Sequence, residues 1–267
     1  MSVTRAALRL IRVDTSVAGF LSLFLPFVVR TADVSRSLLV AGPLLFISIC
    51  TFIANDLNDH QRDEVNHPER PLPSGHITPS FAAALYFVFL TAALLTTRYC
   101  VRENIAFWYY FLMALSISYG HIVEHLPVLK APYVAAVIAI PVLILASSFH
   151  DANLHVIAIA VFLFNTGKEL CMDVIDRPGD VPSPIHKILA RHITLAAACL
   201  QMISVALLVI LSVSGTRHLT ALFLSVMIVL QGSSAYYLLV RDNLRYATHL
   251  MRAQLVLGFY FIAAPSY

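Results

Sequence analysis

Long apolar segments recur along this whole chain, and they limit what it can fold into more than any other feature. We count nine runs that are long enough to cross a lipid bilayer when tilt and ragged ends are allowed. Only 12% of the residues are charged, whereas a soluble domain is typically about one quarter charged. The sequence therefore predicts an all-α, polytopic membrane helical bundle of about nine transmembrane helices, forming one domain over residues 1–267.

The predicted spans are separated by short polar loops. Their approximate limits are Thr15–Val29, Leu38–Ala54, Ser80–Thr97, Ile105–Tyr119, Tyr133–Phe149, Leu154–Leu170, Ile193–Val213, Leu219–Val240 and Tyr246–Ala264. Three arginines before the first span are also typical of a secretory signal peptide. However, Asp14 interrupts the approach to the apolar run, and no convincing small-residue cleavage site follows Pro26. We therefore expect a retained first helix.

The lysine and arginine residues are distributed unevenly between alternate loops, and this bias sets the orientation of a membrane protein. Twelve of the 18 lysines and arginines fall on the side of the N-terminus, and five fall on the other side. The N-terminus is therefore expected in the cytoplasm. The net charge of +3 is then explained by topology and phosphate contacts, and it does not indicate a nucleic-acid partner.

Two short stretches on the predicted cytoplasmic side repeat one aspartate spacing. The first follows the second span and contains Asp56, Asp59 and Asp63; the second follows the sixth span and contains Asp173, Asp176 and Asp180. An acid pressed against the end of a membrane span needs water, a cation or a pairing partner, because an isolated charge at the bilayer centre costs about 2.5–3.5 kcal/mol. Two identical triplets on one side therefore indicate a function. They also suggest an internal duplication with one acidic segment in each half.

The spacing of the first triplet suits the binding of a hard cation. If a helix continued past Ala54, its three carboxylates would lie on one face. Magnesium prefers oxygen ligands and is commonly held by one or two carboxylates together with substrate phosphates. The sequence thus predicts Mg²⁺ as the cofactor and the six aspartates as its ligands. In the second triplet Pro178 and Gly179 disfavour a continuous helix through Asp180, so Asp173 and Asp176 are the safer ligands there.

The residues of both triplets also carry a family resemblance. The stretch NDLNDHQRDEVNHPERPLPSGHIT, residues Asn55–Thr78, resembles the first signature of the UbiA family of intramembrane prenyltransferases, and GKELCMDVIDRPGD, Gly167–Asp180, resembles the second. The predicted layout, in which each signature follows an even-numbered span, is similar to that of the family. This resemblance implies a prenyl transfer from an allylic isoprenoid diphosphate to an aromatic or lipid acceptor within the membrane lipid, in a cavity that opens toward the lipid.

The resemblance also implies roles for individual residues. The six aspartates would bind magnesium and the diphosphate, with Asn55 beside the leaving group. Metal ions and nearby cations stabilise the negative charge that develops on a departing diphosphate. We expect Arg70, Lys130 and Lys168 to contact the phosphates. Arg70 lies in the first signature, Lys130 in the predicted cytoplasmic loop after the fourth span, and Lys168 about one turn before Asp173.

Two other functions are compatible with the same residues. Some proteins of this superfamily resemble terpene cyclases, which ionise a prenyl diphosphate and cyclise it without an acceptor. An ion-coupled transporter is the third class, but it predicts charges near the bilayer midplane, whereas these aspartates cluster toward one side.

The second motif also bears on the subgroup that the chain resembles. It lacks the pattern of the ubiquinone-precursor subgroup. The chain looks closer to members that alkylate glycerol-phosphate lipids or join prenyl tails to chlorophyllide-like and quinone-like acceptors.

Overall fold

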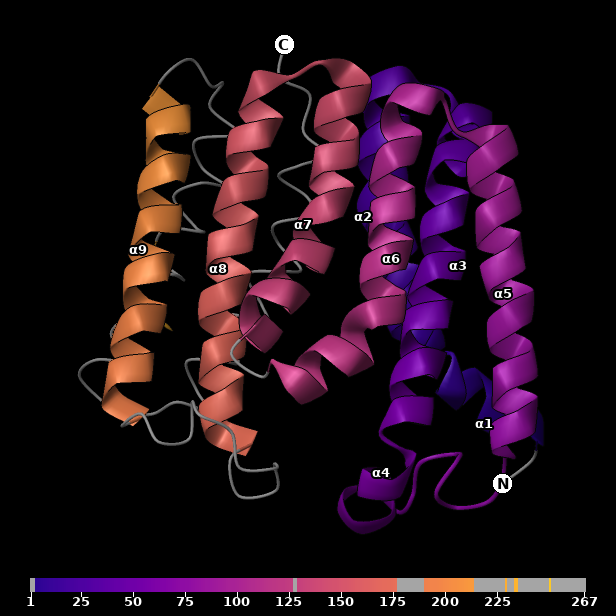
Figure 1. Cartoon of the computed structure of the whole chain (residues 1–267). Coiled ribbons are helices and arrows are strands. Elements are labelled where there is room, and N and C mark those ends of the chain that lie inside the picture. Colours follow the sequence, from indigo (N-terminus) through magenta and orange to yellow (C-terminus); the bar gives the residue numbers. More distant parts are fainter. Residues whose placement is uncertain are drawn as a thin grey trace. The chain divides into compact units, whose positions relative to one another are not determined.

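The computed structural model describes residues 3–126, 129–176 and 190–213, together with the single positions 229, 233, 234 and 250. All its described elements are α-helices (Figure 1). The chain divides into two compact units, Met1–His121 and Ile122–Tyr267, so each unit contains one of the two acidic motifs. Whether the whole chain acts as a single domain stays a prediction.

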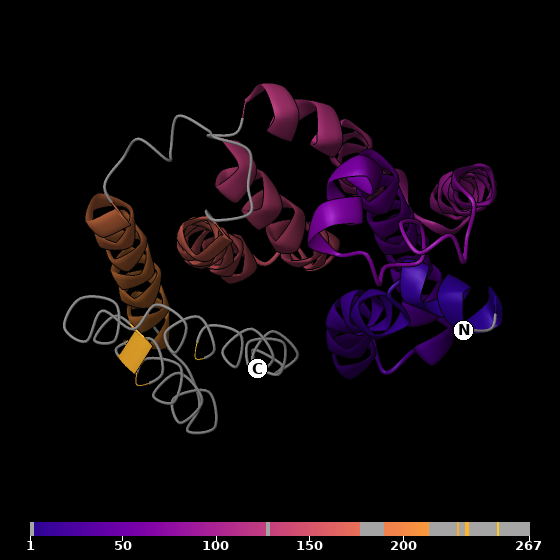
Figure 2. The same cartoon turned by 90° about the horizontal axis from the view of Figure 1, so that it is seen from below.

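The first unit is built around a long helix that ends in the first acidic motif. This helix, α3 (Val34–Asn58), packs against α2 (Val13–Thr31) and α5 (Pro79–Cys100). The unit also holds the short α1 (Val3–Leu10) and α4 (His60–Asn66), and most of α6 (Glu103–His125). Figure 2 shows the long helices α2 and α5 of this unit nearly end-on. The short α4 lies beyond the C-terminal end of α3 (Figure 1).

Local chemistry explains where the helices of the first unit begin. Asp33 caps α3, because its Oδ1 accepts a hydrogen bond of 2.9 Å from the backbone N–H of Arg36. Thr78 caps α5 in the same way through Phe81, and Pro79 occupies the first helical turn, where a missing N–H costs nothing. Both acidic and hydroxyl caps satisfy backbone donors that a helix start leaves open.

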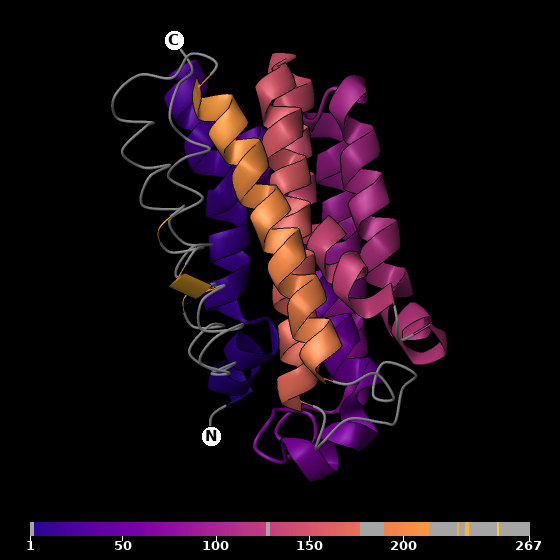
Figure 3. The same ribbon diagram turned by 90° about the vertical axis from the view of Figure 1, so that its left-hand side faces the viewer.

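The second unit repeats the arrangement of one central helix between two neighbours. Helix α8 (Ala152–Asp176) carries the second motif and packs against α7 (Lys130–Phe149) and α9 (Ala190–Val213). Figure 3 shows α9 lying along α8. Helices α3 and α8 both have 25 residues and both begin directly after an aspartate whose Oδ1 accepts a backbone hydrogen bond: Asp33 before α3, and Asp151 before α8. A helix of this length spans about 37 Å at 1.5 Å per residue, enough to cross a hydrocarbon core of about 30 Å.

The predicted spans agree with these helices as far as the structure describes them. The first seven predicted spans correspond to α2, α3, α5, α6, α7, α8 and α9. Six of the described helices, all of these except α6, are long and apolar enough to cross a membrane. The all-helical membrane bundle is therefore confirmed. The last two predicted spans fall almost wholly outside the described residues, so the count of nine stays a prediction.

The outer surface of both units suits a lipid environment. On α5 the side chains of Phe87 and Val88 are 64% and 63% exposed, and on α9 Ile210 is 65% exposed. Large exposed apolar patches mark sites of contact with membranes or other proteins. These helices therefore present apolar side chains outward, as expected for segments that contact lipid.

A glycine on α8 allows α9 to approach closely, and this gives the first testable prediction. A Cβ atom placed on Gly167 would lie 2.9 Å from the backbone carbonyl oxygen of Ala197, which cannot rotate away. We expect Gly167→Ala to destabilise the folded protein by about 1–3 kcal/mol, measured by thermal unfolding in detergent. Gly42→Ala on α3 is the matched control, because nothing lies within 4 Å of its added methyl group. An equal melting temperature in the two variants would contradict this reading.

Candidate active site

The first motif places two buried carboxylates at the end of α3 and in α4. Asp56 and Asp63 are each only 4% exposed. The helix continues past Ala54 as expected, but it ends at Asn58. Asp59 caps it with φ −89° and ψ 2°, and α4 starts at the next residue. The expected single face of one unbroken helix is therefore not formed, because the chain changes direction at Asp59.

Arg70 brings the two buried carboxylates together. Its Nη1 atom lies 2.5 Å from Oδ2 of Asp63 and 3.9 Å from Oδ1 of Asp56. The loop that holds Arg70 is a series of turns, in which Leu72 and Ile77 are buried and anchor the backbone. This loop lies in the first unit and returns the guanidinium to the end of α3. Arg70 was expected to contact phosphates, and the structure places it between two of the predicted magnesium ligands.

A second arginine, Arg12, contacts the carboxylate of Asp56. From its place in the sequence, Arg12 was expected only to contribute to the topology. The Nη2 atom of Arg12 donates a hydrogen bond of 2.8 Å to Oδ1 of Asp56. The guanidinium also lies 4.9 Å from the centre of the Phe52 ring, a distance at which cations are attracted to aromatic faces. Residues 12 and 56 are 44 positions apart, so no spacing in the sequence could have revealed this contact.

The second motif shows a similar ion pair in the second unit. Asp173 is 6% exposed, and its Oδ1 lies 2.7 Å from Nζ of Lys130, the first residue of α7. Lys168 lies 2.6 Å from Glu169 on the same helix. Two of the expected phosphate contacts are thus paired with acids here. Asp176 is the last residue of α8, its side chain is not among those described, and Asp180 lies outside the described residues.

The donor set fits magnesium better than a cation that needs a complete protein cage. In the described part of the chain, no group of three His, Cys, Asp or Glu side chains is arranged to hold a metal ion by itself. Magnesium usually takes one or two carboxylates and completes its shell with water and substrate phosphates. Asp56 and Asp63 in one unit and Asp173 in the other offer such carboxylates, each buried and each beside a cation. Asn55 lies directly before Asp56, and its carbonyl oxygen accepts a hydrogen bond from the N–H of Asp59.

A comparison with models of known protein families shows which family the chain belongs to. A sequence model of the UbiA prenyltransferase family matches residues 17–264. The chain belongs to this family. The resemblance that the two signatures suggested is therefore confirmed, and both signatures lie within the matched UbiA region.

Curated relatives of this UbiA family chain include three proteins named digeranylgeranylglyceryl phosphate synthase. It is 30% identical over 190 residues to the digeranylgeranylglyceryl phosphate synthase of Methanoculleus marisnigri, covering 67% of this chain and 65% of that one. The corresponding enzyme of Sulfolobus acidocaldarius is 37% identical over 98 residues, which is 36% of this chain and 35% of that one. The chain therefore spans between about one third and two thirds of the length of these relatives.

Solved structures of UbiA-type proteins share the fold. A structure of digeranylgeranylglyceryl phosphate synthase superimposes with a TM-score of 0.76 at 18% identity, covering 98% of this chain and 96% of that one. A UbiA homologue from Archaeoglobus fulgidus, bound to GPP and Mg²⁺, gives a TM-score of 0.68 at 18% identity, covering 97% and 100%. At this identity the similarity shows a common architecture and nothing more.

Proposed function

We propose that this chain is a magnesium-dependent membrane prenyltransferase that joins the prenyl group of an allylic isoprenoid diphosphate to a lipid hydroxyl. The observation that carries this proposal is the repeated placement of a buried carboxylate near the C-terminal end of a membrane helix, with an arginine or lysine bound to it. Asp56 with Arg12 and Arg70 is one example, and Asp173 with Lys130 is the other. In such a pair the carboxylate can bind a metal ion, and the arginine or lysine can bind the phosphates that accompany the metal.

The names of the curated relatives favour one class of acceptor over the other. Aromatic and lipid acceptors are both compatible with the motifs, but the curated relatives are named digeranylgeranylglyceryl phosphate synthases. We therefore propose a prenylated glyceryl phosphate as the acceptor class. A structural neighbour binds GPP and Mg²⁺, which supports an isoprenoid diphosphate as the donor. From the excess of lysine and arginine on one side, we infer that the two motifs face the cytoplasm.

The reaction requires that a carbon–oxygen bond to the diphosphate breaks and its electron pair leaves with the diphosphate. The acceptor hydroxyl oxygen then bonds to the allylic carbon, and its proton passes to water or to an oxygen of the released diphosphate. Mg²⁺ held by the motif aspartates would supply neutralisation of the negative charge that develops on the leaving group. Arg70 and Lys130 hold positive charge next to those aspartates, where they can bind phosphate oxygens and orient the donor.

The proposal is tested by incubating the purified chain in lipid nanodiscs with geranyl or geranylgeranyl diphosphate and Mg²⁺. Three parallel reactions contain geranylgeranylglyceryl phosphate, an aromatic acid acceptor, or no acceptor. We expect an ether product only with the glyceryl phosphate, and no diphosphate release when a chelator is in excess. If a cyclic hydrocarbon forms in the reaction without an acceptor, the chain is a terpene cyclase and the proposed prenyl transfer is wrong. Release that continues in excess chelator would contradict the metal requirement.

A further inference from the structure

Arg12 adopts a backbone conformation that L-residues rarely take. Its φ and ψ are 44° and 58°, in the left-handed region, at the junction between α1 and α2. Its N–H donates to the carbonyl of Arg9 and its carbonyl accepts from Ser16, so the residue closes one helix and opens the next. Such strain persists only where surrounding contacts determine it, and it often occurs at functional positions.

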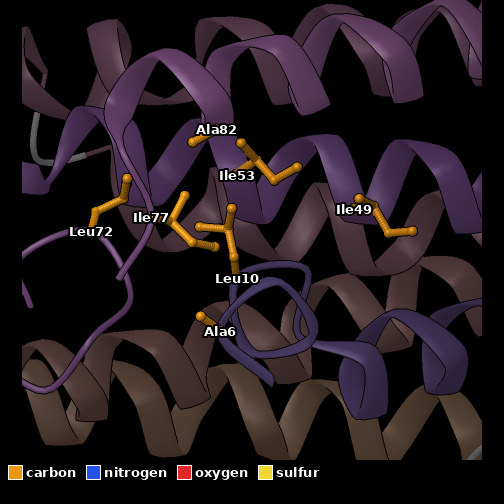
Figure 4. Close-up of a cluster of buried hydrophobic side chains, with 7 residues drawn as sticks. All are labelled: Ala6, Leu10, Ile49, Ile53, Leu72, Ile77 and Ala82. Carbon is orange, nitrogen blue, oxygen red and sulfur yellow. The ribbon is translucent and has the colours of Figure 1, made fainter. Parts of the chain in front are cut away.

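Two kinds of contact hold Arg12 in this conformation. Helix α1 is anchored by Ala6 and Leu10, which are fully buried in a cluster that also contains residues of α3, of the first-motif loop and of α5 (Figure 4). The members of this cluster are Ala6, Leu10, Ile49, Ile53, Leu72, Ile77 and Ala82. Beyond the anchored helix, the Arg12 guanidinium contacts Asp56 and the Phe52 ring. The strained turn therefore joins a fixed helix to a cation placed on a motif aspartate.

Asp56 has more positive charge around it than a single ion pair requires. Arg12 contacts its Oδ1 at 2.8 Å, and Arg70 lies 3.9 Å from the same atom while making its closer contact with Asp63. Both contacts are to Oδ1, and the two oxygens of one carboxylate are close neighbours, so a divalent cation on either oxygen of Asp56 lies within a few ångströms of the Arg12 guanidinium. Like charges at that distance repel each other. Arg12 and Mg²⁺ therefore compete for this carboxylate.

A diphosphate changes the balance of this competition. It brings several anionic oxygens, which an arginine binds in a geometry as favourable as that of a carboxylate. The Arg12 side chain is 34% exposed, so its guanidinium is not enclosed. Resting on the proposed function, we propose that Arg12 is an exchangeable counter-cation. It neutralises Asp56 when no metal ion is bound there, and moves to the diphosphate when Mg²⁺ and the donor bind together.

This exchange couples the binding of the metal to the binding of the donor. Metal alone must displace Arg12 without offering it a new partner, so it binds weakly. Metal together with diphosphate gives the guanidinium a phosphate partner, so the two ligands assist each other. Removing Arg12 should therefore have opposite effects on the two binding steps. A residue that only supported the fold would weaken both or neither.

The experiment compares two glycine substitutions at left-handed positions on the two ends of α2. Arg12→Gly removes the guanidinium and suits the left-handed backbone. Ala32→Gly is the matched control, because Ala32 has φ 53° and lies at the opposite end of the same helix. The full-length variants are titrated with Mn²⁺, which takes the same oxygen ligands as Mg²⁺, first alone and then with inorganic pyrophosphate. Bound Mn²⁺ is measured by electron paramagnetic resonance.

We expect Arg12→Gly to bind Mn²⁺ alone about three- to tenfold more tightly and pyrophosphate with Mn²⁺ about ten- to a hundredfold more weakly, the range for losing a charged hydrogen bond. Ala32→Gly should match the unmodified protein in both titrations. If Arg12→Gly weakens both steps, or changes neither, the exchange is excluded. If it does not fold, Arg12→Lys replaces it: we expect unchanged Mn²⁺ binding and several-fold weaker pyrophosphate binding, and weaker Mn²⁺ binding or unchanged pyrophosphate binding would exclude the exchange. Unmodified protein that binds neither ligand would instead overturn the proposed function.

Discussion

Replacing Asp56 by asparagine should lower the rate of diphosphate release by about a hundred- to a thousandfold, the loss typical of removing a group that stabilises developing charge. Asparagine keeps the shape of the side chain but loses its negative charge, so it is a poor ligand for Mg²⁺ and a poor partner for Arg12 and Arg70. The rate is measured as pyrophosphate released from geranylgeranyl diphosphate by the purified protein in nanodiscs.

The fold should tolerate this change. Breaking a fully buried ion pair costs about 3–5 kcal/mol, but the side chains of Arg12 and Arg70 are 34% and 30% exposed, so water can solvate them. Arg70 also keeps its contact with Asp63. We therefore expect a cost of about 1 kcal/mol or less, as for exposed pairs, seen as a small change in melting temperature.

The same helix provides a matched control for this variant. Asp33→Asn makes an identical chemical change at the other end of α3, where asparagine caps a helix as well as aspartate does. This variant should release diphosphate at the unmodified rate. If Asp33→Asn and Asp56→Asn lose activity equally, the effect comes from the stability of α3, and the assignment of Asp56 to the site is wrong.

Asp173→Asn in the second unit should reduce diphosphate release by a similar factor. Asp173 is 6% exposed, and its Oδ1 lies 2.7 Å from Nζ of Lys130, so the change removes a buried anionic oxygen from the second motif. Asp151→Asn is the control here, because Asp151 lies before the start of α8 and its Oδ1 accepts a backbone hydrogen bond from Asn153. We expect this control to keep full activity, by the same pyrophosphate assay.

The double variant Asp56→Asn/Asp173→Asn tests whether the two carboxylates depend on each other in diphosphate release. Groups that act as a unit show strongly non-additive losses, because the second removal has little left to disrupt. We expect the double variant to be only slightly slower than either single variant. If the two losses multiply fully, the carboxylates contribute independently, and the expected dependence between them is wrong.

Some of the site was predictable from the sequence, and some was not. Asp56, Asp63 and Asp173 were selected by spacing, and all three are buried. Asp56 and Asp173 lie near the C-terminal ends of α3 and α8, and Asp63 lies in the short α4. The spacing argument failed at Asp59, where α3 ends. Asparagine and aspartate side chains compete with the helical backbone for hydrogen bonds, and Asn58 and Asp59 stand next to each other at that point. The spacing of the aspartates could not show that α3 ends at Asn58, between Asp56 and Asp59.

Of the basic residues that contact these carboxylates, some were predictable from the sequence and one was not. Arg70 and Lys168 were selected because they lie in the two motifs, and Lys130 because it lies in the predicted cytoplasmic loop after the fourth span. Each of the three contacts a carboxylate in the structure. Arg12 was counted only as a charge before the first span. Its approach to Asp56 depends on the turn between α1 and α2 and on how α1 packs against α3. Neither the turn nor the packing of α1 could be predicted from the residues next to Arg12 in the sequence.

The sequence by itself determined the class of the protein, its transmembrane helices as far as they are described, and its family. Apolar length and motif spacing are local properties, and a membrane forces each apolar run to satisfy its own backbone as a helix. Only the tertiary structure decided which cation meets which carboxylate. Arg12 with Asp56 and Lys130 with Asp173 join residues more than 40 positions apart, and such pairs form because helices pack side by side, which no short stretch of sequence specifies.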